Sequence, residues 1–418
     1  MRNAGYAAVW LLVLVIPLEN AILIPGVGTL GRMTGILALA MGGFALVAQK
    51  KEIRLHPALW LMLVFVLLCG TSFFWTIDPE NTIKRVFTYF QNFLMMWLIF
   101  QWCDDEKKVH GLYLAFILGS LGLTYGIFDQ FLSGEIVVRV KAYNFNPNEI
   151  ASILSLSIPF AWYLFLVKRG PVRWGCVLIL PAVSLAMLLT GSRAGFVKGL
   201  MGVAFILLTP PPGMWRTWGI VIGGSTIAAI VSIIQFLPEY TLNRLLSTQA
   251  ELVSGDLGGR GLIWSTGLEV FSHHPVFGVG AGTFSKTMTP FFTGPPAPHN
   301  VFVSLLVDHG VVGLVAFGAI ALTAVGSILR LAGIELRLWI TVFGIWGACI
   351  MTSNWEWRKQ MWLLLILAVT HGANSIRGNT VYVRQINRNV SLGKFAIDKA
   401  GRLIVGERSL SNLRNRSK

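Results

Sequence analysis

The sequence predicts an all-α membrane protein with about twelve transmembrane helices and one long, partly helical loop on a single face. Hydrophobic residues make up 54% of the 418 residues and charged residues only 13%, a balance typical of a chain whose surface faces lipid. Apolar windows of about 16 to 25 residues, long enough to cross a bilayer as helices, recur along almost the whole chain. The predicted segments are 6–24, 33–48, 57–75, 86–102, 109–132, 150–167, 174–190, 194–209, 218–237, 301–329, 338–353 and 361–373.

Both ends of the chain are predicted to be cytoplasmic, because basic residues are retained on that side of short loops. Most of the 34 lysines and arginines then fall on the cytoplasmic side. The first segment also resembles a signal peptide, but it lacks a small-residue cleavage site and we interpret it as a helix. We therefore expect a transmembrane bundle over residues 1–376, an exposed loop over 238–300 between the ninth and tenth helices, and a basic cytoplasmic tail over 377–418.

The formal net charge of +15 follows from this uneven distribution, with the whole excess on the cytoplasmic side. A basic tail beside the last membrane helix is typical of a topology determinant that touches anionic lipid. The composition therefore predicts contact with membrane lipids and no nucleic-acid partner.

The long loop over 238–300 is expected to carry function, since loops of this length inside a compact protein are usually functional or disordered. Its stretch 260–271 has apolar spacing compatible with a short helix at the membrane surface. Glycines follow at Gly278, Gly280 and Gly282. No Walker motif or strand accompanies them, so a turn that lets the loop pack over the bundle is favoured over nucleotide binding.

Two arginines between small residues are candidate phosphate ligands on this face. Arg193 lies in Gly191-Ser192-Arg193-Ala194-Gly195, and Arg260 follows Gly258-Gly259. Small neighbours leave a guanidinium accessible, and its planar fork can hold two phosphate oxygens at once. The alternative is a structural arginine that reaches to the membrane interface.

His299 ends the long loop after a stiff Pro-Pro-Ala-Pro run and is predicted to lie on the same face as both arginines. An imidazole titrates near neutrality and can take a proton from an attacking hydroxyl, although many loop histidines only form structural hydrogen bonds. The pair His273-His274 allows a zinc site with His299 or Asp256. No metal-binding spacing supports that interpretation, and we expect no metal and no cofactor.

Several other polar residues are secondary candidates for substrate contact or for support of the site. They are Ser192 and Asn300 beside the main candidates, Asp308 in the tenth segment, and Arg139 and Lys141 in a smaller exposed loop. Asp308 and His309 either line a substrate path, orient His299, or pack against a loop. A turn with Trp355, Glu356, Arg358 and Lys359 is interpreted as an interfacial anchor.

Three motifs together resemble the bacterial O-antigen ligases and the wider superfamily of O-antigen polymerases and protein O-oligosaccharyltransferases. They are GSRAG at the end of one helix, GGRGLIW in the long loop, and HNVFVSLLVDHGVVGL at the start of the next helix. The resemblance is most specific between residues 190 and 314 and elsewhere is one of hydropathy. It implies a GT-C-like fold in the bacterial inner membrane, with the long loop in the periplasm.

The resemblance also implies an activity, with Arg193, Arg260 and His299 at the positions of the family's functional residues. The implied donor is a polysaccharide on undecaprenyl diphosphate, and the implied acceptor is a sugar of the lipid A core. A diphosphate is a good leaving group, so two guanidinium groups and one base suffice for inverting displacement without a metal. A polymerase with the same donor, a lipid or secondary transporter, and a non-catalytic scaffold are the alternatives.

Overall fold

The computed structural model describes residues 4–26, 28–134, 140–211, 259–391, 395–397 and 403–405, with side chains up to Ile376. Helices dominate this described part of the chain. They are α1 (Ala4–Val15), η1 (Ile16–Leu18), α2 (Leu30–Ala48), α3 (Pro57–Thr71), η2 (Ser72–Phe74), α4 (Pro79–Trp102), α5 (Glu106–Leu132), α6 (Pro147–Val167), α7 (Pro171–Leu178), α8 (Leu180–Leu189), α9 (Arg193–Leu208), α13 (Arg260–His273), α14 (Phe284–Met288), η3 (Thr289–Phe291), α15 (Val301–Ile328), α16 (Gly333–Thr352) and α17 (Lys359–Ser391). Two short antiparallel hairpins complete the described elements, β1 (Leu23–Ile24) with β2 (Gly28–Thr29) and β3 (Phe395–Ile397) with β4 (Leu403–Val405).

The prediction of an all-α polytopic membrane protein is confirmed. Each predicted segment within the described residues contains a helix, whereas the ninth, 218–237, lies outside them. Among the described residues, 7 helical stretches are long and apolar enough to cross a membrane. The remaining predicted segments do not reach that length and hydropathy, because α1 and α9 have only 12 and 16 residues and because α4 and α17 carry more polar residues.

Two predicted helix ends were wrong, those of the first and the last segment. The first helical stretch ends at Leu18 instead of residue 24, because Glu19 accepts hydrogen bonds from Lys359 and Gln360 of α17 and the chain then turns into the β1–β2 hairpin. The seventh segment is found as one candidate span, Pro171–Leu189, with an interruption between α7 and α8 next to Pro181, whose ring removes a backbone donor. The last helix, α17, continues to Ser391, well past the predicted end.

The most buried helix is α6, whose apolar window is 89% buried within the protein. It packs against α5, α8, α9 and α16, and aromatic side chains fill the space between them. Tyr113 of α5, for example, stacks on Phe160 of α6 with ring centroids 4.6 Å apart. This core fixes the relative positions of the helices whose ends form the candidate site.

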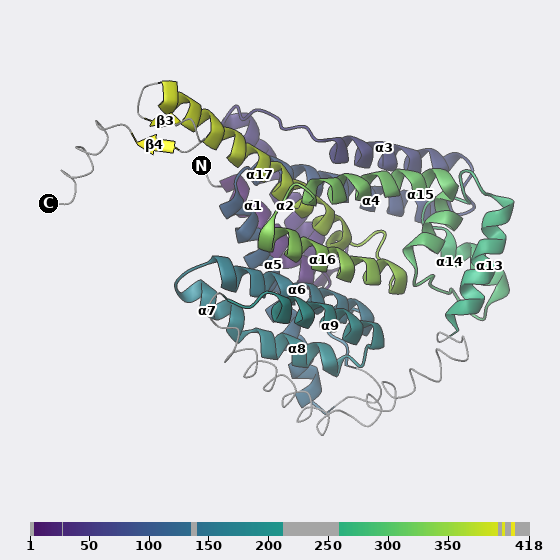
Figure 1. Ribbon diagram of the computed structural model, residues 1–418. Coiled ribbons are helices and arrows are strands. Elements are labelled where there is room, and N and C mark those ends of the chain that lie inside the picture. Colours follow the sequence, from purple (N-terminus) through teal and green to yellow (C-terminus); the bar gives the residue numbers. More distant parts are fainter. Residues whose placement is uncertain are drawn as a thin grey trace.

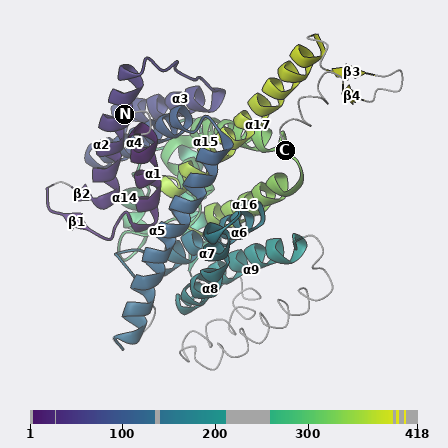
Figure 2. The same ribbon diagram turned by 90° about the vertical axis from the view of Figure 1, so that its left-hand side faces the viewer.

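The bundle has two distinct ends. The short helices α13 and α14 lie at one end, while α1 begins and α17 finishes at the other (Figure 1). At the end opposite α13, Lys51 and Lys108 both bind Asp104, and Arg54 bonds to Asn374. These contacts join the α2–α3 loop, the α4–α5 loop and α17 at this end of the bundle. The sequence predicts both loops on the same face of the membrane. The flanks also differ, since α2 and α4 lie on the side of the bundle opposite to α9 in both views (Figures 1 and 2).

Candidate functional site

His299 is held by two neighbouring segments. Its backbone N–H donates to the Oδ1 of Asn354, in the loop between α16 and α17. The carbonyl of the preceding residue, Pro298, accepts a 2.8 Å hydrogen bond from the Trp264 indole of α13. His299 itself has a φ of +47°, in the left-handed region. The chain is therefore fixed on both sides of the imidazole, which is half-buried.

Arg260 lies beside His299. It is the first residue of α13, and Trp264 follows one helical turn later on the same face. Burial, with a smaller contribution from the Arg260 guanidinium, lowers the pKa of His299 to about 4. The imidazole is consequently neutral near pH 7 and has a free lone pair for a proton. The predicted helix over 260–271 is confirmed by α13, which spans Arg260–His273.

Arg193 is likewise the first residue of its helix, α9. The dipole of a helix disfavours a positive charge at that end, so the stability of α9 and α13 does not explain either arginine. An anion placed there would interact with both the guanidinium and the helix N-terminus.

The N-terminal turn of α6 links α9 to the loop that holds His299. Ser192, the N-cap of α9, donates a 2.8 Å hydrogen bond to Asn148 of α6. The adjacent Glu149 accepts a bidentate pair from Arg358, from Nε to Oε1 at 2.9 Å and from Nη2 to Oε2 at 2.8 Å. Arg358 belongs to the same connection as Asn354. These contacts bring the surroundings of Arg193 and of His299 to one end of the bundle.

Asp308 supports the glycine-rich loop. Its Oδ2 accepts a 2.8 Å hydrogen bond from the backbone of Gly282, and the N–H of Gly280 donates to the Asp308 carbonyl. The helix α15 is broken at Gly310, where φ is +64°, and the loop backbone packs into this break. A Cβ on Gly310 would lie 2.3 Å from the Val276 carbonyl oxygen. Gly278, Gly280 and Gly282 therefore allow the loop backbone to pack closely against the helix bundle.

A partly buried ion pair joins α4 to the turn before α17. Arg85 of α4 is 3.9 Å from Glu356, which also accepts a 3.1 Å hydrogen bond from Ser304 of α15. Burial raises the pKa of the Glu356 carboxyl, and the charge of Arg85 opposes that rise. Glu356 and Trp355 are 4% and 1% exposed, so their interpretation as interfacial anchors was wrong. They face the protein interior because α4, α15 and α17 close over the turn.

The secondary candidates have structural contacts of their own. Asn300 caps α15, where its Oδ1 accepts hydrogen bonds from Phe302 and Val303. Lys141 is exposed and its backbone bonds to Gln130, while Arg139 lies outside the described residues, as does Asp256. In the described part of the chain, no three His, Cys, Asp or Glu side chains are grouped to hold a metal ion.

Sequence reasoning missed the residues that position His299. Asn354 and Trp264 are ordinary loop and helix residues, and only the folded chain brings them to the Pro298–His299 backbone. A possible signal was the strongly polar turn 353–359 between two apolar helices. At this end of the bundle Arg193 and Arg260 each begin a helix, and His299 follows the loop that Trp264 of α13 holds. Such a set of groups can bind a diphosphate and deprotonate a hydroxyl.

A protein-family model described as O-antigen ligase matches residues 174–318. The matched range begins within α7, ends within α15 and includes Arg193, Arg260 and His299. A comparison with curated proteins finds no match.

Proposed function

We propose that this chain, whose residues 174–318 match the O-antigen ligase family model, is a glycosyltransferase of the bacterial inner membrane with its site in the periplasm. The donor is O-antigen polysaccharide on undecaprenyl diphosphate, and the acceptor is a sugar hydroxyl of the lipid A core. The observation that carries this proposal is the half-buried imidazole of His299, whose backbone is fixed by Asn354 and by Trp264 of α13, the helix that begins at Arg260. This arrangement supplies a base and an anion ligand at the same end of the bundle.

In the proposed mechanism Arg193 and Arg260 bind the donor diphosphate and stabilise the charge that develops as it leaves. His299 accepts the proton of the acceptor hydroxyl while that oxygen bonds to the anomeric carbon. The bond from the anomeric carbon to the diphosphate oxygen breaks on the opposite face, which inverts the configuration. The imidazolium then releases its proton to solvent. The reaction uses no metal and no cofactor, because the diphosphate is already a good leaving group.

The proposal is tested by profiling lipopolysaccharide in a deletion strain complemented with variants. His299→Ala, Arg193→Ala and Arg260→Ala should each give rough lipopolysaccharide and accumulated carrier-linked polymer. Arg193→Lys should lose about tenfold or more of the transfer rate, since a lysine keeps the charge but not the bidentate grip. His273→Ala, which alters an exposed histidine of α13, is the matched control and should ligate normally.

Other outcomes identify the alternatives. Core capped with a single unpolymerised repeat would assign the chain to the polymerases of the same superfamily. Normal ligation by all three alanine variants would remove the proposed site and favour a scaffold. Movement of the carrier lipid across liposomes without transfer would instead indicate a transporter.

A further inference from the structure

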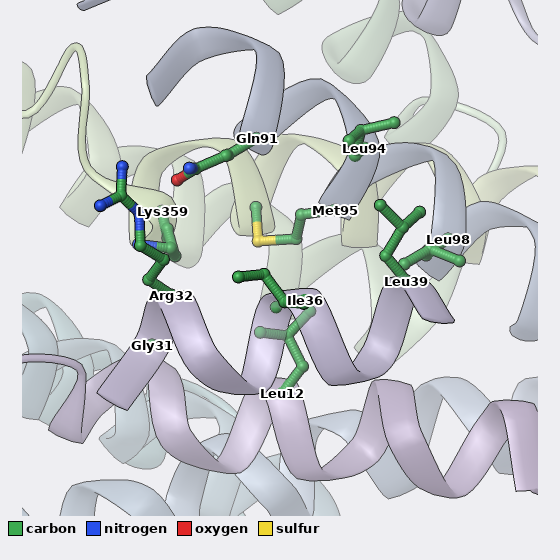
Figure 3. Close-up of a pocket in the computed structure, with 11 residues that line it drawn as sticks. Leu12, Gly31, Arg32, Ile36, Leu39, Gln91, Leu94, Met95, Leu98 and Lys359 are labelled. Atoms are coloured by element: carbon green, nitrogen blue, oxygen red, sulfur yellow. The ribbon is translucent and has the colours of Figure 1, made fainter. Parts of the chain in front are cut away.

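An apolar cleft opens between α2 and α4 on the outer surface of the bundle. Leu12 of α1 lies at its base, Ile36 and Leu39 of α2 form one wall, and Leu94, Met95 and Leu98 of α4 form the other (Figure 3). The hollow between these side chains has a volume of about 70 Å³ and is open to the surface. A cleft with apolar walls at a lipid-facing surface is suited to a hydrocarbon chain.

One end of this cleft is polar and basic. Arg32, Gln91 and Lys359 lie together at that end (Figure 3) and also line an adjoining polar cleft. Lys359 is neutralised by Glu19 at 2.7 Å, whereas Arg32 is exposed and forms no ion pair with any described residue. The free guanidinium gives the mouth of the cleft an affinity for an anionic group. The ligand therefore combines a hydrocarbon chain with a negatively charged head.

The mouth opens at the α13 end of the bundle. Lys359 directly follows the turn that contains Asn354, the partner of the His299 backbone. The ring centroid of Trp357, in the same turn, lies 5.1 Å from the guanidinium carbon of Arg85 and 4.0 Å from that of Arg358. A ligand head at Arg32 is thus on the same face as the candidate site.

The position of the cleft distinguishes between the two lipid substrates of the proposed function, on which this inference rests. The donor carries its hydrocarbon chain directly on the diphosphate, so its tail begins near Arg193 and Arg260. The cleft, in contrast, is lined by α2 and α4. These two helices lie on the flank of the bundle opposite α9 (Figures 1 and 2). In the acceptor, several core sugars separate the lipid anchor from the reacting hydroxyl, and this spacing can bridge the two sites.

We propose that the α2–α4 cleft is the docking site for the lipid anchor of the acceptor. One acyl chain of the phosphorylated glycolipid lies between Ile36, Leu39 and Met95, and a phosphate of its head binds Arg32. The two lipid substrates then enter from opposite flanks of the bundle and meet at His299.

The test introduces a larger side chain that occupies the cleft, at a position where its Cβ does not clash with the protein. Gly35 lines the cleft, and a Cβ on it would have no heavy atom within 4 Å. Gly43 on the same helix is equally unobstructed but lies outside the cleft, so Gly43→Leu is the matched control for Gly35→Leu. The full-length protein in nanodiscs is titrated with diphosphorylated lipid A, with phosphatidylglycerol and with undecaprenyl phosphate.

Gly35→Leu should weaken lipid A binding by about tenfold or more, because the leucine occupies space needed for buried methylenes. Arg32→Gln should weaken it by about threefold to tenfold, through loss of one charge-assisted contact. Gly43→Leu should bind as the wild type does, and undecaprenyl phosphate binding should be the same in all three variants. Unchanged lipid A binding by Gly35→Leu, or equal competition by phosphatidylglycerol, would overturn the proposal.

A transfer assay separates this inference from the proposed function. With a water-soluble core oligosaccharide that lacks acyl chains, Gly35→Leu should transfer at the wild-type rate, although its rate with the complete glycolipid falls. Equal losses with both acceptors would contradict an anchor site. Absence of transfer by the wild type would contradict the proposed function alone, since the binding titration still reports on the cleft.

Discussion

The backbone of His299 has a conformation that residues other than glycine seldom adopt, with φ at +47°. Such a conformation persists only where the surroundings impose it, and it is frequent at functional sites. Here the hydrogen bonds of Asn354 and Trp264 impose it on both sides of the residue. We infer that these contacts aim the imidazole while leaving its two nitrogens for substrate.

The pH dependence of transfer tests the protonation state of His299. Its pKa is lowered from 6.5 to about 4 by burial and by Arg260, so the folded protein keeps a neutral base well below pH 6. We expect kcat/KM, measured with purified enzyme, to be flat from about pH 5 to 8 and to fall as pH drops through about 4. A decline centred near the ordinary histidine value would show that the imidazole is solvated and not held as described.

At the scale of elements, the turn between α16 and α17 acts as the support of His299. Asn354→Ala removes the acceptor of the His299 N–H, and we expect kcat to fall by about tenfold while KM for the donor changes little. Asn354→Asp retains an acceptor oxygen and should keep most of the activity. Parallel changes in KM and kcat, or loss of activity in the aspartate variant as well, would indicate a general structural role.

The break in α15 is the second element on which the site depends. Gly310→Ala combines a φ of +64° with a Cβ that would lie 2.3 Å from the Val276 carbonyl oxygen. We expect a loss of about 2 kcal/mol or more in the free energy of unfolding, measured by thermal unfolding in detergent. Gly318→Ala on the same helix meets no atom within 4 Å and should be neutral or slightly stabilising.

The helices and the surface helix α13 could be predicted from the sequence because hydropathy and apolar spacing are local properties. The break at Gly310 could not, since it depends on the loop backbone at Val276, which meets α15 only in the folded chain. The same holds for Glu356, whose burial comes from three different helices. Arg193, Arg260 and His299 were selected by motif resemblance, whereas the supports of His299 are non-local and leave no sequence pattern.

At the scale of the whole molecule, the two ends of the bundle have different charge networks. At the α13 end, Glu19 after η1 pairs with Lys359 of α17, and Glu149 of α6 pairs with Arg358 just before α17. These partly buried pairs are balanced locally and are screened less by salt than surface pairs. At the opposite end the loops carry an excess of lysine and arginine, as expected for the cytoplasmic side.

This asymmetry predicts which end faces the periplasm, and the native cysteines make the prediction simple to test. Cys69, Cys103, Cys176 and Cys349 are all buried, so the wild type should react little with a thiol reagent. Thr293→Cys, in an exposed loop at the α13 end, should react with a membrane-impermeant maleimide in intact spheroplasts.

Lys107→Cys, exposed at the opposite end, should react with the same maleimide only after lysis. The reverse pattern would place His299 in the cytoplasm, where a periplasmic polysaccharide cannot reach it. Labelling of both variants in intact cells would show that the two ends do not lie on opposite sides of the membrane. The proposed reaction requires the first pattern, because the hydroxyl, the diphosphate and the imidazole must share one compartment.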